Sequence, residues 1–181
     1  MPVPEDEVGG LSRRQFLKTG FAGSLLLAGG SATALLAGCA SQTAAPGFAF
    51  LRPQDVAVVR ALIPVVLADA VPAGDTQAIE RVLKSADDFI AGTSPAAMDQ
   101  LKQLFDLLSL APARVALCGL WDDWPQASAS DLDAFLTRWR DSRLDLLRAG
   151  YLGLVKIITA SWYLLPESWV AIGYEAPIHV V

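Results

Sequence analysis

The chain has 181 residues, a formal net charge of −5 and a hydrophobic fraction of 53%. Because nucleic-acid binding relies on a concentrated basic surface, this acidic composition excludes nucleic acid as a partner. The two cysteines form neither a Cys-x-x-Cys-His haem site nor a ligand set for an iron–sulfur cluster.

Residues 1–38 are typical of a cleavable export signal. Ser12-Arg13-Arg14-Gln15-Phe16-Leu17-Lys18 forms a twin-arginine motif, an address that implies a protein folded, or already carrying a partner, before export. The apolar stretch from Phe21 to Leu36 is diluted by glycines and falls short of the roughly 20 strongly apolar residues that a membrane span prefers. We expect a signal peptide, the alternative being a permanent N-terminal membrane anchor.

The signal ends in Leu36-Ala37-Gly38-Cys39, which matches a lipoprotein cleavage box. Lipid on Cys39 would hold the mature protein on a membrane in the periplasm, and stable anchoring needs more than one acyl chain. The alternative is a simple peptidase cut at Ala37 and Gly38. The signal is neutral overall, so the whole charge belongs to the residues from Cys39 onward, which suit one ordinary domain.

A short tether over residues 39–50 and a helical domain over residues 51–181 are predicted. Apolar residues at helical spacing run from Asp55 to Ala70, where Pro64 should kink or split the helix. After a turn, a second helix is predicted from Thr76 to Ile90.

The second half of the chain continues the helical pattern. Ser94 and Pro95 are an N-cap serine and a first-position proline, and they mark the start of the third helix. Ser128 and Ser130 compete as the cap of the fifth helix, and Gly150 either breaks the chain before the sixth or makes a close contact within it. The expected segments are 95–110, 112–120, one burying Leu132, Phe135, Leu136, Trp139 and Leu146, one carrying Tyr151 to Trp162, and a turn from Pro166 through Trp169.

No alternating β pattern exceeds a few residues. The sequence therefore predicts an all-α fold, a compact bundle of about six helices after the signal peptide.

Candidate catalytic or metal-binding residues do not converge in the sequence. His179 is the single histidine and lies in the C-terminal tail, without a second histidine to share a metal or orient a nucleophile. Asp87 and Asp88 are adjacent in sequence, as are Asp122 and Asp123. On a helix, the two side chains of such a pair point about 100° apart, and both pairs are expected to be solvated. Cys118 lies in an apolar run and is expected to be a buried thiol. We expect no catalytic, cofactor-binding or metal-binding residue in this chain.

Four aromatic side chains gather near the C-terminus, at Trp162, Tyr163, Trp169 and Tyr174. Helical spacing places some of them in the core, which is the simpler interpretation. Four large rings in a turn-rich segment exceed what a small core usually holds, and exposed aromatic clusters are the usual anchors of protein interfaces. We treat these four as candidates for a partner interface. The predicted loop 121–125 raises the same question with two more tryptophans.

The C-terminal segment also carries a family resemblance. Ala149-Gly150-Tyr151 and the run from Ser161-Trp162-Tyr163 through Gly173-Tyr174-Glu175-Ala176-Pro177 resemble the C-terminal signature of the gluconate 2-dehydrogenase subunit 3 family. The resemblance covers most of residues 50–177, the C-terminal segment being its distinctive part, and the twin-arginine leader matches as well.

The resemblance implies a small, cofactor-free, gamma-type helical subunit. Its partner would be a large FAD-dependent dehydrogenase of the glucose–methanol–choline type, which leaves the cytoplasm bound to the small subunit. Electrons would pass from the flavin to a cytochrome c subunit or a quinone. Two features depart from the family pattern, the lipoprotein box at Cys39 and Pro64 within the first helix.

These observations lead to the hypothesis that the protein is a non-catalytic accessory subunit of a periplasmic dehydrogenase. It would export the dehydrogenase through the twin-arginine translocase, assist its maturation and tether it to the membrane. A domain without a site needs a reason to use a route for folded proteins, and co-export of a folded flavoprotein is such a reason. The rival is a free-standing envelope lipoprotein that serves as a binding or scaffolding module with a small apolar pocket. A third hypothesis, an enzyme that uses Cys118, requires an exposed thiol of low pKa.

Overall fold

Helices account for the regular structure of residues 42–171 and 173, the part of the chain that the computed structural model describes. Within these residues there is no β-strand, and the predicted all-α bundle is confirmed. The elements are α3 (Pro53–Val66), α4 (Thr76–Ala91), α5 (Pro95–Ser109), α6 (Ala111–Ala113), the π-helix η1 (Arg114–Cys118), α7 (Ala129–Arg140), α8 (Asp145–Tyr163) and α9 (Pro166–Ala171). The twin-arginine motif, Cys39, Tyr174 and His179 lie outside the described residues. None of the described helices combines the length and apolarity that crossing a membrane would take.

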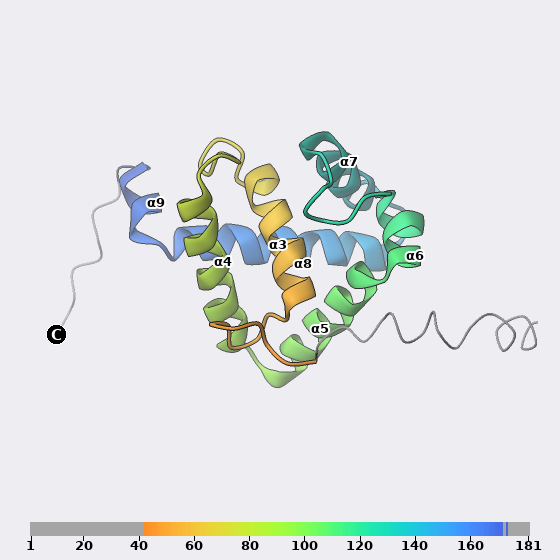
Figure 1. Cartoon of the computed structure of the whole chain (residues 1–181), viewed down its shortest axis with the longest axis horizontal. Helices are drawn as coiled ribbons and strands as arrows, with labels where there is room; N and C mark the ends of the chain where they lie inside the picture. Colours follow the sequence, from red (N-terminus) through yellow and green to blue (C-terminus); the bar gives the residue numbers. More distant parts are fainter. Residues whose placement is uncertain (1–41, 172, 174–181) are drawn as a thin grey trace, which may run out of the picture. The chain divides into compact units, whose positions relative to one another are not determined.

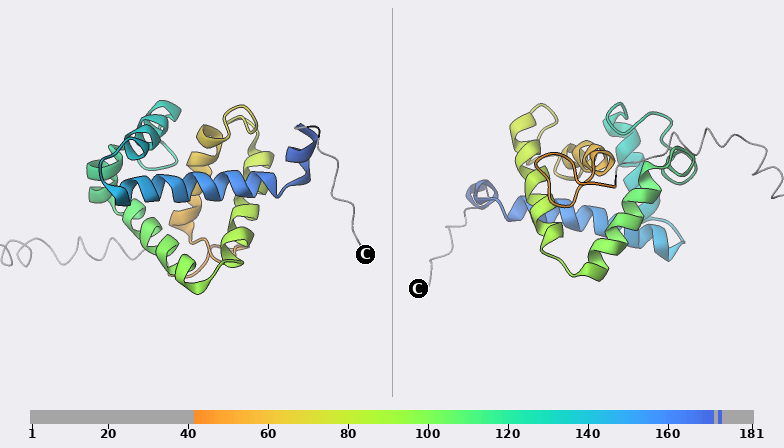
Figure 2. Two further views of the ribbon diagram at one scale, coloured as in Figure 1. Left: turned by 180° about the vertical axis from the view of Figure 1, so that it is seen from behind. Right: turned by 60° about the horizontal axis from the view of Figure 1, so that its bottom comes forward.

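The long helix α8 forms the base on which α3, α4 and α7 pack (Figure 1). Their contact surfaces supply the core, whose fully buried side chains include Leu62, Leu83, Phe135 and Ile158. Seen from behind, α8 runs across the front of the domain with the other helices beyond it (Figure 2). One face of α8 is therefore buried in the core and the opposite face is uncovered within the described residues.

Local capping signals set the helix starts. The side chains of Asp75, Ser94 and Ser128 accept the backbone N–H of the residue three positions on, which satisfies a free donor of the first turn. Ser128, rather than Ser130, is thus the cap of α7. Pro64 lies inside α3 without splitting it, and the helix ends at Val66 rather than at the predicted Ala70.

The expected helix 112–120 is present as the short α6 followed by the π-helix η1, which ends at Cys118 with Gly119 as its cap at a φ of 67°. One prediction between α7 and α8 was wrong. Leu146 was expected in the core, but it belongs to α8 and is 75% exposed. The chain leaves the helical path after Arg140, and the Ser142 hydroxyl accepts the N–H of Leu144 before α8 begins.

Gly150 makes a close contact within α8 and does not break it. A Cβ atom at this position would lie 2.5 Å from Cζ3 of Trp139, closer than real Cβ contacts allow. The Trp139 ring is 1% exposed and its indole N–H donates to the carbonyl of Leu117 at 3.0 Å, so it has little freedom to move. The absence of a side chain at Gly150 lets α7 and α8 approach each other.

The described part of the predicted tether is folded onto the domain. In residues 42–50, the N–H of Ala45 donates to the carbonyl of Leu51 at 2.8 Å, and the N–H of Phe48 donates to Ala45 at 2.9 Å. Ala45 and Leu51 are buried, and Phe48 and Phe50 pack against the core. We call residues 45–51 the N-terminal arm.

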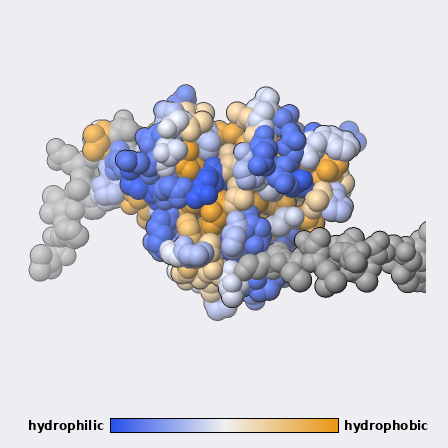
Figure 3. All heavy atoms as spheres, viewed as in Figure 1, coloured by the Kyte–Doolittle hydropathy of each residue, from blue (hydrophilic) through white to orange (hydrophobic). Residues whose placement is uncertain are grey.

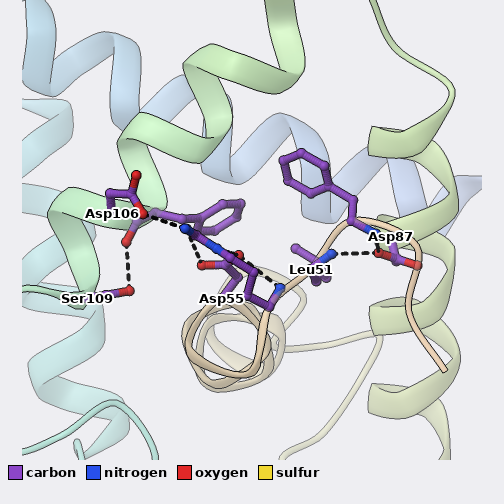
Figure 4. Close-up of polar contacts among 8 residues, drawn as sticks. Leu51, Asp55, Asp87, Asp106 and Ser109 are labelled. Atoms are coloured by element: carbon purple, nitrogen blue, oxygen red, sulfur yellow. Dashed lines mark hydrogen bonds and ion pairs between the residues drawn. The ribbon is translucent and has the colours of Figure 1, made fainter. Parts of the chain in front are cut away.

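Asp87 holds this arm, and its prediction as a solvated residue was wrong. Its carboxylate accepts the N–H groups of Ala49, Phe50 and Leu51 at 2.7, 2.8 and 2.9 Å, and this side chain of α4 is fully buried (Figure 4). Lys84 closes the site with an ion pair of 3.1 Å. Asp88, by contrast, is exposed as predicted.

A buried arginine follows directly after the arm. The Arg52 guanidinium is paired with Asp55 at 2.8 Å and with Asp106 on α5 at 2.6 Å (Figure 4). The Asp55 carboxylate also accepts the N–H of Arg52, so it caps α3. The pair Arg52–Asp106 joins the start of α3 to α5.

Candidate partner-binding surface

The four aromatic interface candidates have separate environments. Trp162 is 9% exposed and belongs to the core, as the simpler interpretation held. Tyr163 is 50% exposed at the end of α8, and the Trp169 indole on α9 donates to its carbonyl at 2.9 Å. Tyr174 lies outside the described residues. The structure therefore brings Tyr163 and Trp169 together at the α8–α9 corner and removes Trp162 from any surface.

A second surface, which the sequence argument missed, is the outer face of α8. Leu146, Leu152 and Tyr163 are 75, 63 and 50% exposed, and Leu164 just beyond the helix is 55% exposed. Several large apolar side chains exposed along one helix indicate a candidate interaction surface. A signal for it existed, because Lys156 is the single charged residue between Ala149 and Leu165.

The α8–α9 corner is fixed to α4 by polar contacts. Arg81 on α4 pairs with Glu167 on α9 at 2.9 Å, and the Ser85 hydroxyl donates to the carbonyl of Ser161 at 2.9 Å. A shallow hollow of about 490 Å³ separates α4 from Leu164 and Leu165. Val170 on α9 is 81% exposed.

A wider groove of about 690 Å³ lies on the other side of the molecule, along α3. Figure 3 looks onto this side, where hydrophobic atoms lie in a hollow between hydrophilic masses. Several small side chains of α3 line it, and the pair Arg60–Glu80, 2.8 Å apart, is also part of the lining. The lining includes Ala57, Ala61, Pro64, Ile79, Trp124 and Leu132.

Cys118 is buried, as predicted. The thiol is 2% exposed, and burial raises its pKa to about 12, although the charges of Arg138 and Arg114 act in the opposite direction. Such a thiol lacks the thiolate character that a nucleophile needs. The enzyme hypothesis based on this residue therefore has no support.

The remaining charged and aromatic candidates have structural contacts or lie at the surface. Asp123 is exposed and pairs with the largely buried guanidinium of Arg114. Trp124 is buried and donates to the carbonyl of Leu108 at 3.0 Å, whereas Trp121 is 82% exposed. Within the described residues, no group of three or more His, Cys, Asp and Glu side chains is placed to hold a metal ion.

Comparison of the chain with protein-family models, curated proteins and solved structures found no match.

Proposed function

We propose that this protein is the non-catalytic small subunit of a periplasmic, flavin-dependent alcohol or sugar dehydrogenase complex. The observation that carries the proposal is the uncovered apolar face of α8, with Leu146, Leu152 and Tyr163 on one helix. Large apolar side chains exposed along one helix are a common feature of surfaces that bind a partner.

The leader and the family resemblance support one kind of partner. Arg13-Arg14 directs the chain to a route for folded proteins, and Cys39 offers a lipid anchor. The resemblance of the C-terminal segment to gluconate 2-dehydrogenase subunit 3 implies that the passenger is a large FAD-containing subunit. The small subunit would escort this passenger through the twin-arginine translocase and then hold it at the membrane, where a cytochrome c subunit or a quinone receives the electrons.

The proposal is tested by replacing Arg13-Arg14 with Lys-Lys in the cells that make the protein. The expected result is that FAD-containing dehydrogenase activity shifts from the periplasmic and membrane fractions to the cytoplasm. Unchanged export of every flavin dehydrogenase would disprove the escort function. Replacement of Cys39 with Ala separates the two roles, since it should release the complex from the membrane without blocking its export.

A second candidate function is favoured by the groove along α3. A free-standing lipoprotein that binds an apolar ligand would use this concave, largely apolar cavity of about 690 Å³. This candidate predicts that the mature protein is purified from membranes as a monomer. Recovery of a flavoprotein in a constant ratio would favour the accessory subunit instead.

A further inference from the structure

We propose that the face formed by the N-terminal arm and the α4–α5 turn lies against the membrane surface that holds the lipid anchor. The inference rests on the proposed function for the lipid on Cys39, and on the structure for which side of the domain faces the membrane. We call this surface the anchor face. Its six exposed residues are Pro46, Gly47, Ala91, Gly92, Pro95 and Ala96.

The arm and the α4–α5 turn are neighbours in the fold. α4 and α5 diverge from this turn, and the arm crosses between them (Figure 1, and the right view of Figure 2). Asp87 on α4 accepts three backbone N–H groups of the arm, and the Lys84 ammonium lies 5.7 Å from the centre of the Phe48 ring. The pair Arg52–Asp106 then joins the end of the arm to α5. The arm is thus held on both helices.

The segment that carries Cys39 enters the domain at this face. Cys39 is six residues before Ala45, the first residue of the arm, whose N–H donates to the carbonyl of Leu51. An extended chain advances at most about 3.6 Å per residue and a helix about 1.5 Å, so this tether is shorter than the 19-residue helix α8. It is too short to carry the anchor round to the opposite edge of the domain. Lipid on Cys39 therefore keeps the anchor face toward the bilayer.

The chain at this face carries no charge. Residues 42–51 and 89–98 contain no Lys, Arg, Asp or Glu, although the protein has a net charge of −5. Anionic lipid gives a membrane surface a negative potential, which repels acidic groups within a Debye length. Charged groups pressed against the membrane would also lose part of their hydration. An uncharged face is the side that an acidic domain can place closest to such a surface.

The exposed acids around the anchor face begin where the two uncharged segments end. Asp88 precedes the segment 89–98 and pairs with Lys84 at 3.0 Å, and Asp99 follows that segment on α5. Asp106, one side of the pair with Arg52, lies further along α5. These acids favour contact through the uncharged residues between them and oppose a tilt of the domain in either direction.

The short tether also decides between a membrane and a protein as the occupant. A folded partner domain of about 100 residues has a radius of gyration near 13 Å, so it is wider than the extended tether is long. Such a domain does not fit between the anchor face and a bilayer that holds Cys39. The bilayer surface itself is the partner that fits.

The test uses the lipid-modified protein, purified from membranes and reconstituted in vesicles of phosphatidylethanolamine and phosphatidylglycerol. The vesicles include a lipid whose headgroup chelates Ni²⁺, which enhances the relaxation of nitroxide spin labels near the surface. The label is attached at Ala91→Cys on the anchor face or, as a matched control, at Ala134→Cys, an exposed alanine of α7 at the opposite edge of the domain (Figure 1). The buried Cys118 does not compete for the label.

We expect the relaxation enhancement at position 91 to be several-fold larger than at position 134. Equal enhancement at the two positions, a larger one at position 134, or none at either would overturn the proposal. In native membranes, a photo-crosslinker at position 91 should link to lipid. A link to a protein instead would overturn the proposal as well.

An added charge separates contact with the membrane from mere proximity. With the label at position 91, Ala96→Glu should reduce the enhancement in vesicles that contain phosphatidylglycerol and leave it unchanged in vesicles of neutral lipid. Ala134→Glu is the control and should change neither value. Both positions are exposed, so the melting temperature of each variant should stay within a few degrees of the parent protein. Equal responses to Ala96→Glu in the two kinds of vesicle would mean that the face does not contact the membrane.

The outcomes also separate the anchor face from the proposed function. If position 91 lies at the vesicle surface but no flavoprotein is recovered with the protein, the anchor face stands and the escort function is wrong. If a flavin dehydrogenase is recovered and the two labels respond equally, the function stands and the anchor face is wrong. A protein without lipid on Cys39 would overturn both the anchor face and the tethering role.

Discussion

The carboxylate of Asp87 accepts the backbone N–H of Leu51 at 2.9 Å, and it bridges 36 residues of sequence. Two further N–H groups of the N-terminal arm converge on the same carboxylate. One buried acid on α4 thus replaces water for three consecutive backbone donors, which would otherwise be left unpaired where the arm meets the core.

Asp87→Asn should destabilise the domain by about 2–4 kcal/mol at neutral pH, since an amide offers one acceptor oxygen and no charge to these donors. The measurement is denaturant unfolding of the mature protein. Asp88→Asn is the matched control, because that neighbouring side chain is exposed, and it should change stability by less than about 0.5 kcal/mol. Equal effects of the two substitutions would show that the hydrogen bonds from the N-terminal arm to Asp87 do not stabilise the domain.

The same carboxylate should make stability depend on acidic pH. Burial acts to raise the pKa of Asp87, but the N–H groups of Ala49, Leu51 and Phe50 and the Lys84 ammonium together lower it below its ordinary value. Because the folded pKa is the lower one, the stabilisation is complete above the unfolded pKa of about 4 and is lost as pH falls through the folded value. The unfolding free energy should therefore decline below about pH 4, and less steeply in Asp87→Asn.

Gly150→Ala should cost about 1–3 kcal/mol, because the new methyl group would overlap the Trp139 ring. The ring also packs edge-on against Phe135, with centroids 4.9 Å apart, so moving it disturbs the core. Combining Gly150→Ala with Trp139→Phe removes the overlapping atoms. We therefore expect the double variant to lose less unfolding free energy than the two single variants lose in total. Strict additivity would show that the close approach carries no strain.

Arg52→Met should cost about 3–5 kcal/mol, since it leaves the buried carboxylate of Asp55 without its cation. Adding Asp55→Asn should recover part of the loss, because the buried charge disappears with its partner. Thermal and denaturant unfolding of the three variants would measure this coupling. A double variant less stable than Arg52→Met would mean that Asp55 acts mainly as the cap of α3.

The Cys118 thiol should resist alkylation in the folded protein at neutral pH. It is buried, and its pKa of about 12 leaves almost no thiolate. Complete labelling should follow the addition of denaturant, which serves as the control for reagent activity. Rapid labelling of the native protein, monitored by mass spectrometry, would show that the segment around η1 opens readily.

Local signals in the sequence predicted the elements that depend on neighbouring residues. The start of α5 followed from Ser94 and Pro95, and the amphipathic pattern of α4 was sufficient to place its buried face. The break between α7 and α8 was missed because Asp141 to Leu144 contains neither glycine nor proline. Apolar spacing alone then extended the helix and placed Leu146 in the core.

Residues whose role depends on distant partners were beyond sequence reasoning. The sequence around Asp87 and Asp88 predicts two solvated acids. The backbone N–H groups that Asp87 accepts belong to the N-terminal arm, 36 residues away at Leu51. The candidate surface shows the same limit. Aromatic content drew attention to Trp162, which is buried, whereas the exposure of Leu146 and Leu152 depends on which face of α8 the other helices cover.

The hydrogen bonds that hold the N-terminal arm on Asp87 also limit the distance between the domain and Cys39. Six peptide units separate Cys39 from Ala45, where the arm begins, and fully extended they reach about 20 Å. A free tether up to Leu51 would have reached about 40 Å. With lipid on Cys39, the domain would be confined to a layer thinner than the roughly 30 Å hydrocarbon core beneath it. A dehydrogenase docked on α8 would share that confinement, so its encounters with electron acceptors in the membrane would become a search in two dimensions.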